Sequence, residues 1–176
     1  MARRISLREF QSALIDRLTQ AAQGEDRRAL LGILSGQTSW LLALPDAGEI
    51  ISPPPLRPVP LTQPWFAGMT NIRGVLYGVV DFSAFCQGEP TRLNHEARLL
   101  LIGTRHGMNC ALLVSRILGL KNPDTLITVA ETTEPSSRPS WQGEQLRDKE
   151  SDLPTTWRRL HTAALLGDPG FLDITR

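Results

Sequence analysis

Few side chains in this sequence have the types and spacing that enzymatic chemistry requires. Of the 3 histidines, His95 is followed by a glutamate but lacks the second histidine of an HExxH zinc helix. His106 stands in a predicted turn, where we expect it to be exposed, and His161 follows "WRRL", where burial is expected. The GxSxG, GxxxxGK[ST] and GxGxxG patterns are also missing. We therefore expect no catalysis, no metal and no cofactor, with a small hydrolase using His95 or His161 as the alternative.

Cysteine usage, charge and hydropathy exclude several other classes of function. The 2 cysteines, Cys86 and Cys110, form no CxxC or Cys/His cluster, which is typical of reduced thiols in the cytoplasm. The formal net charge of +1 is too balanced for a nucleic-acid binder, and no strand interleaves basic and aromatic residues. The aliphatic runs fall far short of the ~20 residues that a membrane helix needs, and the N-terminus does not resemble a signal peptide. The sequence predicts a soluble, cytoplasmic protein without membrane insertion.

Arg73 is the residue best suited to recognition. It stands between Asn71 and Gly74, directly before an apolar run that predicts a buried strand. Asn71 can hold a turn through its side chain, and glycine lets the backbone turn tightly. From such a rigid base, the guanidinium could grip a carboxylate with a small loss of entropy. That carboxylate belongs either to a partner protein or to a local acid such as Glu49 or Asp81, and the sequence leaves both possibilities open.

The first of the elements that position these residues is a predicted amphipathic helix near the N-terminus. Its apolar stripe recurs at spacings of three and four residues, and consists of Leu7, Phe10, Leu14, Leu18 and Ala21. Ser6 and Glu9 form a capping box, and Gly24 is suited to end the helix. We expect residues 1–28 to form an appendage that packs on the main body. A free helix that binds a partner is the alternative.

From Ala29 onward, short apolar segments alternate with glycine turns. "ALLGILSGQTSWLLAL" and "ARLLLIGTRHGMNCALLV" each predict a hairpin, while "GEII" and "SRILGL" predict single strands. "TTWRRL" predicts a strand, and "TAALL" a short helix after it. Without long helices between the strands, this order favours small β-barrels over a parallel sheet.

Two further segments are interrupted by proline. "SPPPLRPVPLTQP" cannot form a helix or a central strand, because proline lacks the N–H that both require. We expect it to form a stiff strap along the protein's own surface; a polyproline ligand for an SH3-like partner is the alternative. Residues 131–154 are polar and predict a long, mobile loop. Trp141 within it would serve as a docking residue, either for the protein's own barrel or for something else.

The central motif "GMTNIRGVLYGVVDFSAF" contains a spaced set of residues, Gly68, Asn71, Arg73, Gly74 and Asp81. In this set it resembles the strand signature of the CheW domain, the scaffold of bacterial chemotaxis arrays. "LALPDAGEIISPP" upstream and "LLLIGTRHGMNCALLVSRILGL" downstream are similar to the flanking segments of that family, and the resemblance covers about residues 29–172. The leading helix and the ending "WRRLHTAALLGDPGFLDI" resemble the CheW-like protein of the type IV pilus twitching-motility system.

This resemblance implies a mainly β fold of two intertwined five-stranded SH3-like β-barrels, with a helix at the N-terminus and a short one at the C-terminus. Residues 1–28 would form the helix and linker, and 29–176 the CheW-like domain. The implied function is a non-catalytic adaptor in signal transduction. One face would bind the regulatory domain of a CheA-type histidine kinase, and another the cytoplasmic tip of a methyl-accepting chemoreceptor at the inner-membrane array. A flagellar or other chemotaxis array is the alternative setting.

The resemblance also implies which residues bind these partners. It places Arg73 and Glu49 on the receptor-facing surface near the groove between the barrels, with residues of the segment 47–51 beside them. Gly68 and its neighbours would lie near the kinase-facing side. The expected protein-binding residues are Arg73, Glu49, Asn71, Gly74, Gly68, Ala47, Ile50 and Ile51.

Overall fold

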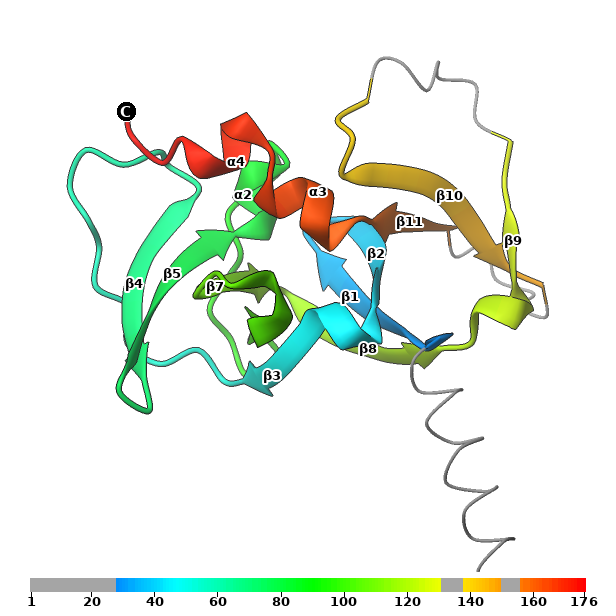
Figure 1. Ribbon diagram of the computed structural model, residues 1–176, viewed down its shortest axis with the longest axis horizontal. Coiled ribbons are helices and arrows are strands. Elements are labelled where there is room, and N and C mark those ends of the chain that lie inside the picture. The colour runs from blue at the N-terminus through cyan, green and yellow to red at the C-terminus, as the bar shows by residue number, and fades with distance from the viewer. Residues whose placement is uncertain (1–27, 131–137, 150–155) are drawn as a thin grey trace, which may run out of the picture.

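The computed structural model describes residues 28–130, 138–149 and 156–176. The predicted N-terminal helix lies outside the described residues. The described chain is mainly β and forms two sheets, with a few short helices along one side (Figure 1). No helix in this part of the chain is long and apolar enough to cross a membrane.

The first sheet has six strands. Their order is β8 (Arg116–Lys121), β1 (Leu30–Ser35), β2 (Thr38–Ala43), β11 (Thr156–Leu160), β10 (Gln142–Asp148) and β9 (Leu126–Thr128). The predicted hairpin is confirmed, since β1 and β2 pair antiparallel around Gly36 and Gln37. Strand β11 pairs with β2 in the parallel direction, so the end of the chain completes a sheet that its beginning starts.

The second sheet has five strands and is formed by the chain between β2 and β8. Their order is β3 (Ala47–Ile51), β6 (Arg98–Ile102), β7 (Cys110–Val114), β5 (Val75–Asp81) and β4 (Phe66–Ile72). The second predicted hairpin is β6–β7, and the predicted strands "GEII" and "SRILGL" are β3 and β8. The two sheets agree with the predicted pair of SH3-like barrels, although the first sheet has one strand more than expected.

Short helices connect the strands. They are η1 (Leu44–Asp46), α2 (Phe82–Phe85), η2 (Thr104–His106), η3 (Pro123–Thr125), α3 (Thr162–Leu166) and α4 (Pro169–Leu172). The strand-then-helix prediction for the C-terminal segment is confirmed by β11 and α3. Helices α2 and α4 were not predicted. Both begin at an aspartate, Asp81 or Asp168, whose carboxylate accepts backbone N–H groups of the first turn.

One hydrophobic core joins both sheets. It includes Ile33 and Trp40 from the first sheet and Val80 and Leu112 from the second. Trp141 is buried in the same core, 4% exposed, with its ring 5.8 Å from that of Trp40. The burial of Trp141 therefore anchors the start of β10 in the core that the two sheets share.

The prediction of a mobile loop over 131–154 is wrong for its middle part. Residues 142–148 form β10, which pairs with β11 on one side and with β9 on the other. The sequence misled us because β10 reads "QGEQLRD" and buries only Gly143 and Leu146. Its position between two strands, and not its hydrophobicity, makes this segment a strand.

The strap prediction for the proline-rich segment is confirmed. Arg57 and Met69 exchange two backbone hydrogen bonds of 2.8 Å, and Thr62 bridges to Thr175 near the C-terminus. Gly68 makes the first contact possible, because a Cβ at this position would lie 2.4 Å from the Arg57 carbonyl oxygen. The strap therefore lies against β4 and the chain end.

Candidate protein-binding site

The turn of the β4–β5 hairpin carries Arg73. The last cross-strand pair is Ile72 with Val75, so Arg73 and Gly74 alone form the turn, with φ of 51° and 87°. Two consecutive positive φ values are what a two-residue type I′ hairpin requires. The Asn71 side chain accepts a hydrogen bond of 2.9 Å from the Gly74 N–H, as predicted. Arg73 is thus presented by a backbone with little freedom.

Arg73 forms a two-pronged ion pair with Glu49 on β3. Its Nη1 donates to Oε2 at 2.9 Å and its Nη2 to Oε1 at 2.7 Å. The pair lies at the surface, with the arginine side chain 77% and the glutamate side chain 40% exposed. Such an exposed pair contributes only ~0–1 kcal/mol to stability. It therefore orients the guanidinium without holding the fold together.

Asp81, the other local acid considered for Arg73, has a structural role. It is buried, and its carboxylate accepts hydrogen bonds from the backbone N–H groups of Ser83, Ala84 and Thr91 and from the Thr91 hydroxyl. These bonds start α2 and attach the following loop to the end of β5. Asp81 therefore holds in place the end of β5, which is the end of the β4–β5 hairpin opposite to Arg73.

Exposed apolar side chains accompany the ion pair. The prediction of a buried strand after Arg73 is wrong for its first residues, because Val75 is 40% and Leu76 53% exposed. Burial begins only at Val79, since the hairpin extends beyond the core. On β3, Ile50 is 38% exposed. Exposed apolar side chains thus follow Arg73 on β5 and neighbour Glu49 on β3, and an exposed apolar patch often marks an interaction surface.

A groove of about 350 Å³ opens beside Glu49. The predicted residues Ala47 and Glu49 line it, together with Tyr77 from β5 and Arg105 from η2. Ile51 is half-buried and packs inward on the cluster of Val79, Leu99 and their neighbours. Within the segment 47–51, the groove is thus lined by Ala47 and Glu49, the exposed surface includes Ile50, and the core is contacted by Ile51.

Asp46 supports the far end of this groove and was missed by sequence reasoning. Its Oδ1 lies 2.8 Å from Nη2 of Arg105 and 2.9 Å from Nε2 of His106, and its carbonyl oxygen accepts the Gly103 N–H. The prediction of an exposed His106 is wrong, because this side chain is only 10% exposed. No local pattern could reveal the contact, since Asp46 and His106 are 60 residues apart.

Arg159 of β11 extends this charged cluster. Burial lowers the pKa of its guanidinium, while the nearby Glu144 and Asp46 carboxylates oppose that change. Asp46 thus faces cations from η2 and from the first sheet. This network holds the beginning of β3 at the junction of the two sheets.

Gly68 lies away from this surface. It is buried beneath the strap with φ of 122°, where only glycine fits. Any role at a partner surface would be indirect, through the path of the strap, so the prediction for its neighbours remains untested.

Both histidines considered for catalysis lie at the surface: His95 is exposed, and the prediction of a buried His161 is wrong because this residue is exposed as well. Within residues 28–130, 138–149 and 156–176, no group of three His, Cys, Asp or Glu side chains is placed to hold a metal ion. Burial raises the pKa of Cys110 to about 12, and burial together with the Asp81 charge raises that of Cys86 to about 12. Both thiols are therefore protonated near neutral pH and unsuited to nucleophilic attack.

Comparisons with known proteins agree with this architecture. The model of the CheW-like domain family matches residues 29–126, which include the hairpin, the ion pair and the groove. The chain is 23% identical over 146 residues to Protein PilI of Pseudomonas aeruginosa, covering 82% of this chain and 78% of that protein. It shares its fold with the scaffolding protein TtCheW from Thermoanaerobacter tengcongensis, with a TM-score of 0.62 and 12% identity over 82% of this chain and 95% of the other. The family match spans more than half of the chain, which therefore belongs to the CheW-like domain family of non-catalytic, chemotaxis-type adaptors.

Proposed function

We propose that this protein is the coupling adaptor of a type IV pilus chemosensory system, linking a methyl-accepting chemoreceptor to a CheA-type histidine kinase. Membership in the CheW-like family supports the adaptor function. Similarity to PilI over most of the chain supports the twitching-motility setting over a flagellar array. The protein would act in the cytoplasm and reach the inner-membrane array through its receptor.

The observation that carries this proposal is the ion pair beside the groove. Arg73 in the β4–β5 turn and Glu49 on β3 are held by well-defined backbone but remain exposed to solvent. The groove next to Glu49 and the apolar side chains of Ile50 and Leu76 offer contact area for a helix of a receptor tip. Because the exposed pair is weak, a carboxylate on the partner can replace Glu49 at little cost.

The kinase would bind a different face, near β4 and the strap that covers Gly68. A bridge requires two faces, since one surface cannot hold both partners at once. Each contact would bury a modest area, with the array supplying avidity through repeated contacts. We also propose that residues 29–176 form one folding unit, because β11 pairs with β2 in the middle of the first sheet.

Calorimetric titration tests this function. The full chain is titrated with the CheW-like regulatory domain of a CheA-type kinase, and separately with a receptor tip, both from the same source. Saturable one-to-one binding of each, and simultaneous binding of both, is expected. If the folded protein binds neither at tens of micromolar, the adaptor proposal is wrong. Stronger binding to flagellar partners from that source would instead place the protein in a flagellar array.

A further inference from the structure

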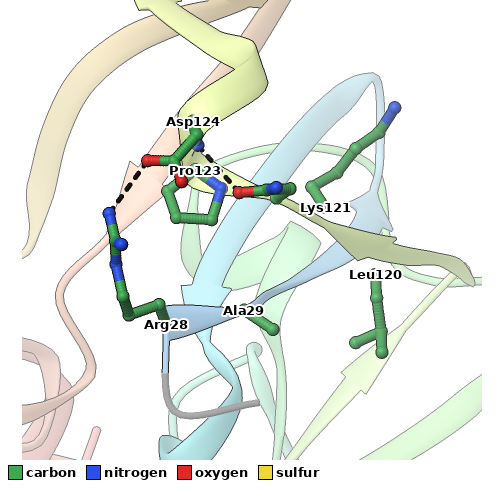
Figure 2. A pocket seen from close by; sticks show the side chains of 7 residues that line it. Arg28, Ala29, Leu120, Lys121, Pro123 and Asp124 are labelled. Carbon is green, nitrogen blue, oxygen red and sulfur yellow. Dashed lines mark hydrogen bonds and ion pairs between the residues drawn. The ribbon is translucent and has the colours of Figure 1, made fainter. Parts of the chain in front are cut away.

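A second pocket lies where the described chain begins. It has a volume of about 330 Å³ and is bordered by residues 28–29 and by the segment 120–124. Figure 2 shows Arg28 and Asp124 facing each other on one side and Leu120 on the other. Ala29, Leu120 and Pro123 make an apolar wall, and charged side chains surround it.

The walls of this pocket are held by local bonds. The Asn122 side chain accepts the Asp124 N–H at 2.9 Å, and Lys149 donates to the Asp124 carbonyl oxygen at 2.7 Å. Lys121 donates to Asp148 at 3.0 Å and lies over the Trp157 ring. The polar groups named here therefore already have hydrogen-bond partners within the chain. Leu120 remains 58% exposed.

The exposed leucine belongs to an edge strand. β8 ends the six-stranded sheet and pairs with β1 on one side. Edge strands with apolar surface promote unwanted association, so proteins commonly cover them with another part of the chain. A covering segment at this place would shield Leu120 and the edge of β8.

The chain itself supplies a segment of matching chemistry. Residues 1–27 carry the predicted apolar stripe, whose last members are Leu18 and Ala21. An extended chain spans ~3.5 Å per residue, so the link from Gly24 to Arg28 reaches about 14 Å at most. Arg28 borders the pocket and pairs with Asp124, so residues 1–27 join the described chain at the edge of the pocket. The link is therefore long enough for the last members of the stripe to reach Leu120.

We propose that residues 1–27 dock on this pocket, with the apolar stripe covering Leu120, Ala29 and Pro123. Tethering favours this occupant over a second copy or an external partner. A link of a few residues gives an effective concentration in the millimolar range, so docking within one chain is saturated when its dissociation constant lies well below a millimolar. A second molecule at micromolar concentration would need far higher affinity to compete.

Cysteine cross-linking in the full chain tests the docking. Leu120→Cys is combined in turn with Leu14→Cys, Leu18→Cys or Ala21→Cys, and the matched control replaces Leu120→Cys by Leu172→Cys, an exposed leucine on α4. The native thiols give little background because their pKa values are raised to about 12. Mild oxidation is expected to give intramolecular disulfides with at least tenfold higher yield for position 120. Equal yields, or disulfides mainly between molecules, would overturn the proposal.

Hydrogen exchange provides a second test that requires no cross-link. Leu120→Glu places a charge in the pocket, and we expect severalfold faster amide exchange in residues 7–21. Leu172→Glu is the control and is expected to leave that exchange unchanged. Both positions are exposed, so thermal unfolding should stay near the wild-type value. Unchanged exchange in Leu120→Glu would show that the segment does not bind here. Neither test depends on the signalling partners.

Discussion

Reversal of the Arg73–Glu49 pair would show whether this arginine contacts a partner or only shapes the surface. Arg73→Glu places two carboxylates together, Glu49→Arg places two guanidinium groups together, and the double variant restores an ion pair with its polarity reversed. If the pair is an internal tie, the double variant recovers both stability and receptor binding. If Arg73 contacts the receptor, the double variant recovers stability alone.

The structure limits the expected effect on stability. The side chains are 77% and 40% exposed, so the pair contributes about 0.5 kcal/mol after screening by solvent. For a chain of this size, that amounts to a shift of ~1–2 °C in Tm. A lost contact to a receptor carboxylate costs more, because charged hydrogen bonds at an interface contribute about 1.5–3 kcal/mol. We therefore expect Arg73→Glu to weaken receptor binding at least tenfold while Tm stays within about 2 °C.

The assay combines thermal unfolding with calorimetric titration of a receptor tip. Arg116→Glu is the matched control, because it breaks the exposed pair of Arg116 with Glu96 on another surface. It should lower stability by a similar amount and leave binding unchanged. Recovery of receptor binding in the double variant would refute direct contact by Arg73. A fall in Tm of 10 °C or more in Arg73→Glu would show that the arginine supports the fold.

Three further predictions concern residues that hold the fold. Gly68→Ala should lower the free energy of unfolding by about 1–3 kcal/mol in urea, because its Cβ would meet the Arg57 carbonyl at φ of 122°; an unchanged midpoint would mean that the strap can move away. Asp81→Ala should lower the free energy of unfolding by about 2 kcal/mol, because it removes the N-cap of α2 and the hydrogen bonds between Asp81 and Thr91. A decrease of less than about 0.5 kcal/mol would contradict the structural role of Asp81. The pKa values of Cys86 and Cys110 are raised from 9.0 to about 12 in the folded protein, so the stability that the protonated thiols contribute is complete below pH 9 and is lost as the pH rises toward 12. The double variant Cys86→Ser, Cys110→Ala should flatten this part of the pH profile, and an equally steep profile would assign it to other groups.

The hairpins could be predicted because their determinants are local. β1–β2 and β6–β7 are apolar runs separated by short turns, and the Arg73–Gly74 turn needs only its own glycine and Asn71. The strap could be predicted because proline excludes other structures. These features depend on residues a few positions apart, so a single sequence contains the information.

Strand β10 could not be predicted, because it forms by pairing on both sides and not by its own hydrophobicity. Trp141 directly before it was assigned to a loop, with docking on the protein's own barrel as one of two alternatives, and only the structure shows that the core encloses it. Helix α2 was missed for a related reason, since its cap, Asp81, also bonds to Thr91 in the following loop. In each case, the neighbours that decide the structure are supplied by other parts of the chain.

The candidate site divides in the same way. The sequence by itself determined that Arg73 stands on a tight turn, because backbone sterics and the Asn71 side chain act within a few residues. Only the tertiary structure decided that its partner is Glu49, 24 residues away, and that Asp46 pairs with Arg105 at the other end of the groove. Charges pair through space, and no local sequence pattern shows which of several acids will lie within 3 Å of a guanidinium. The pairing of Arg73 with Glu49 depends on two features of the fold. Strand β3 pairs with β6, and the β4–β5 hairpin brings its turn close enough to β3 for the two side chains to meet.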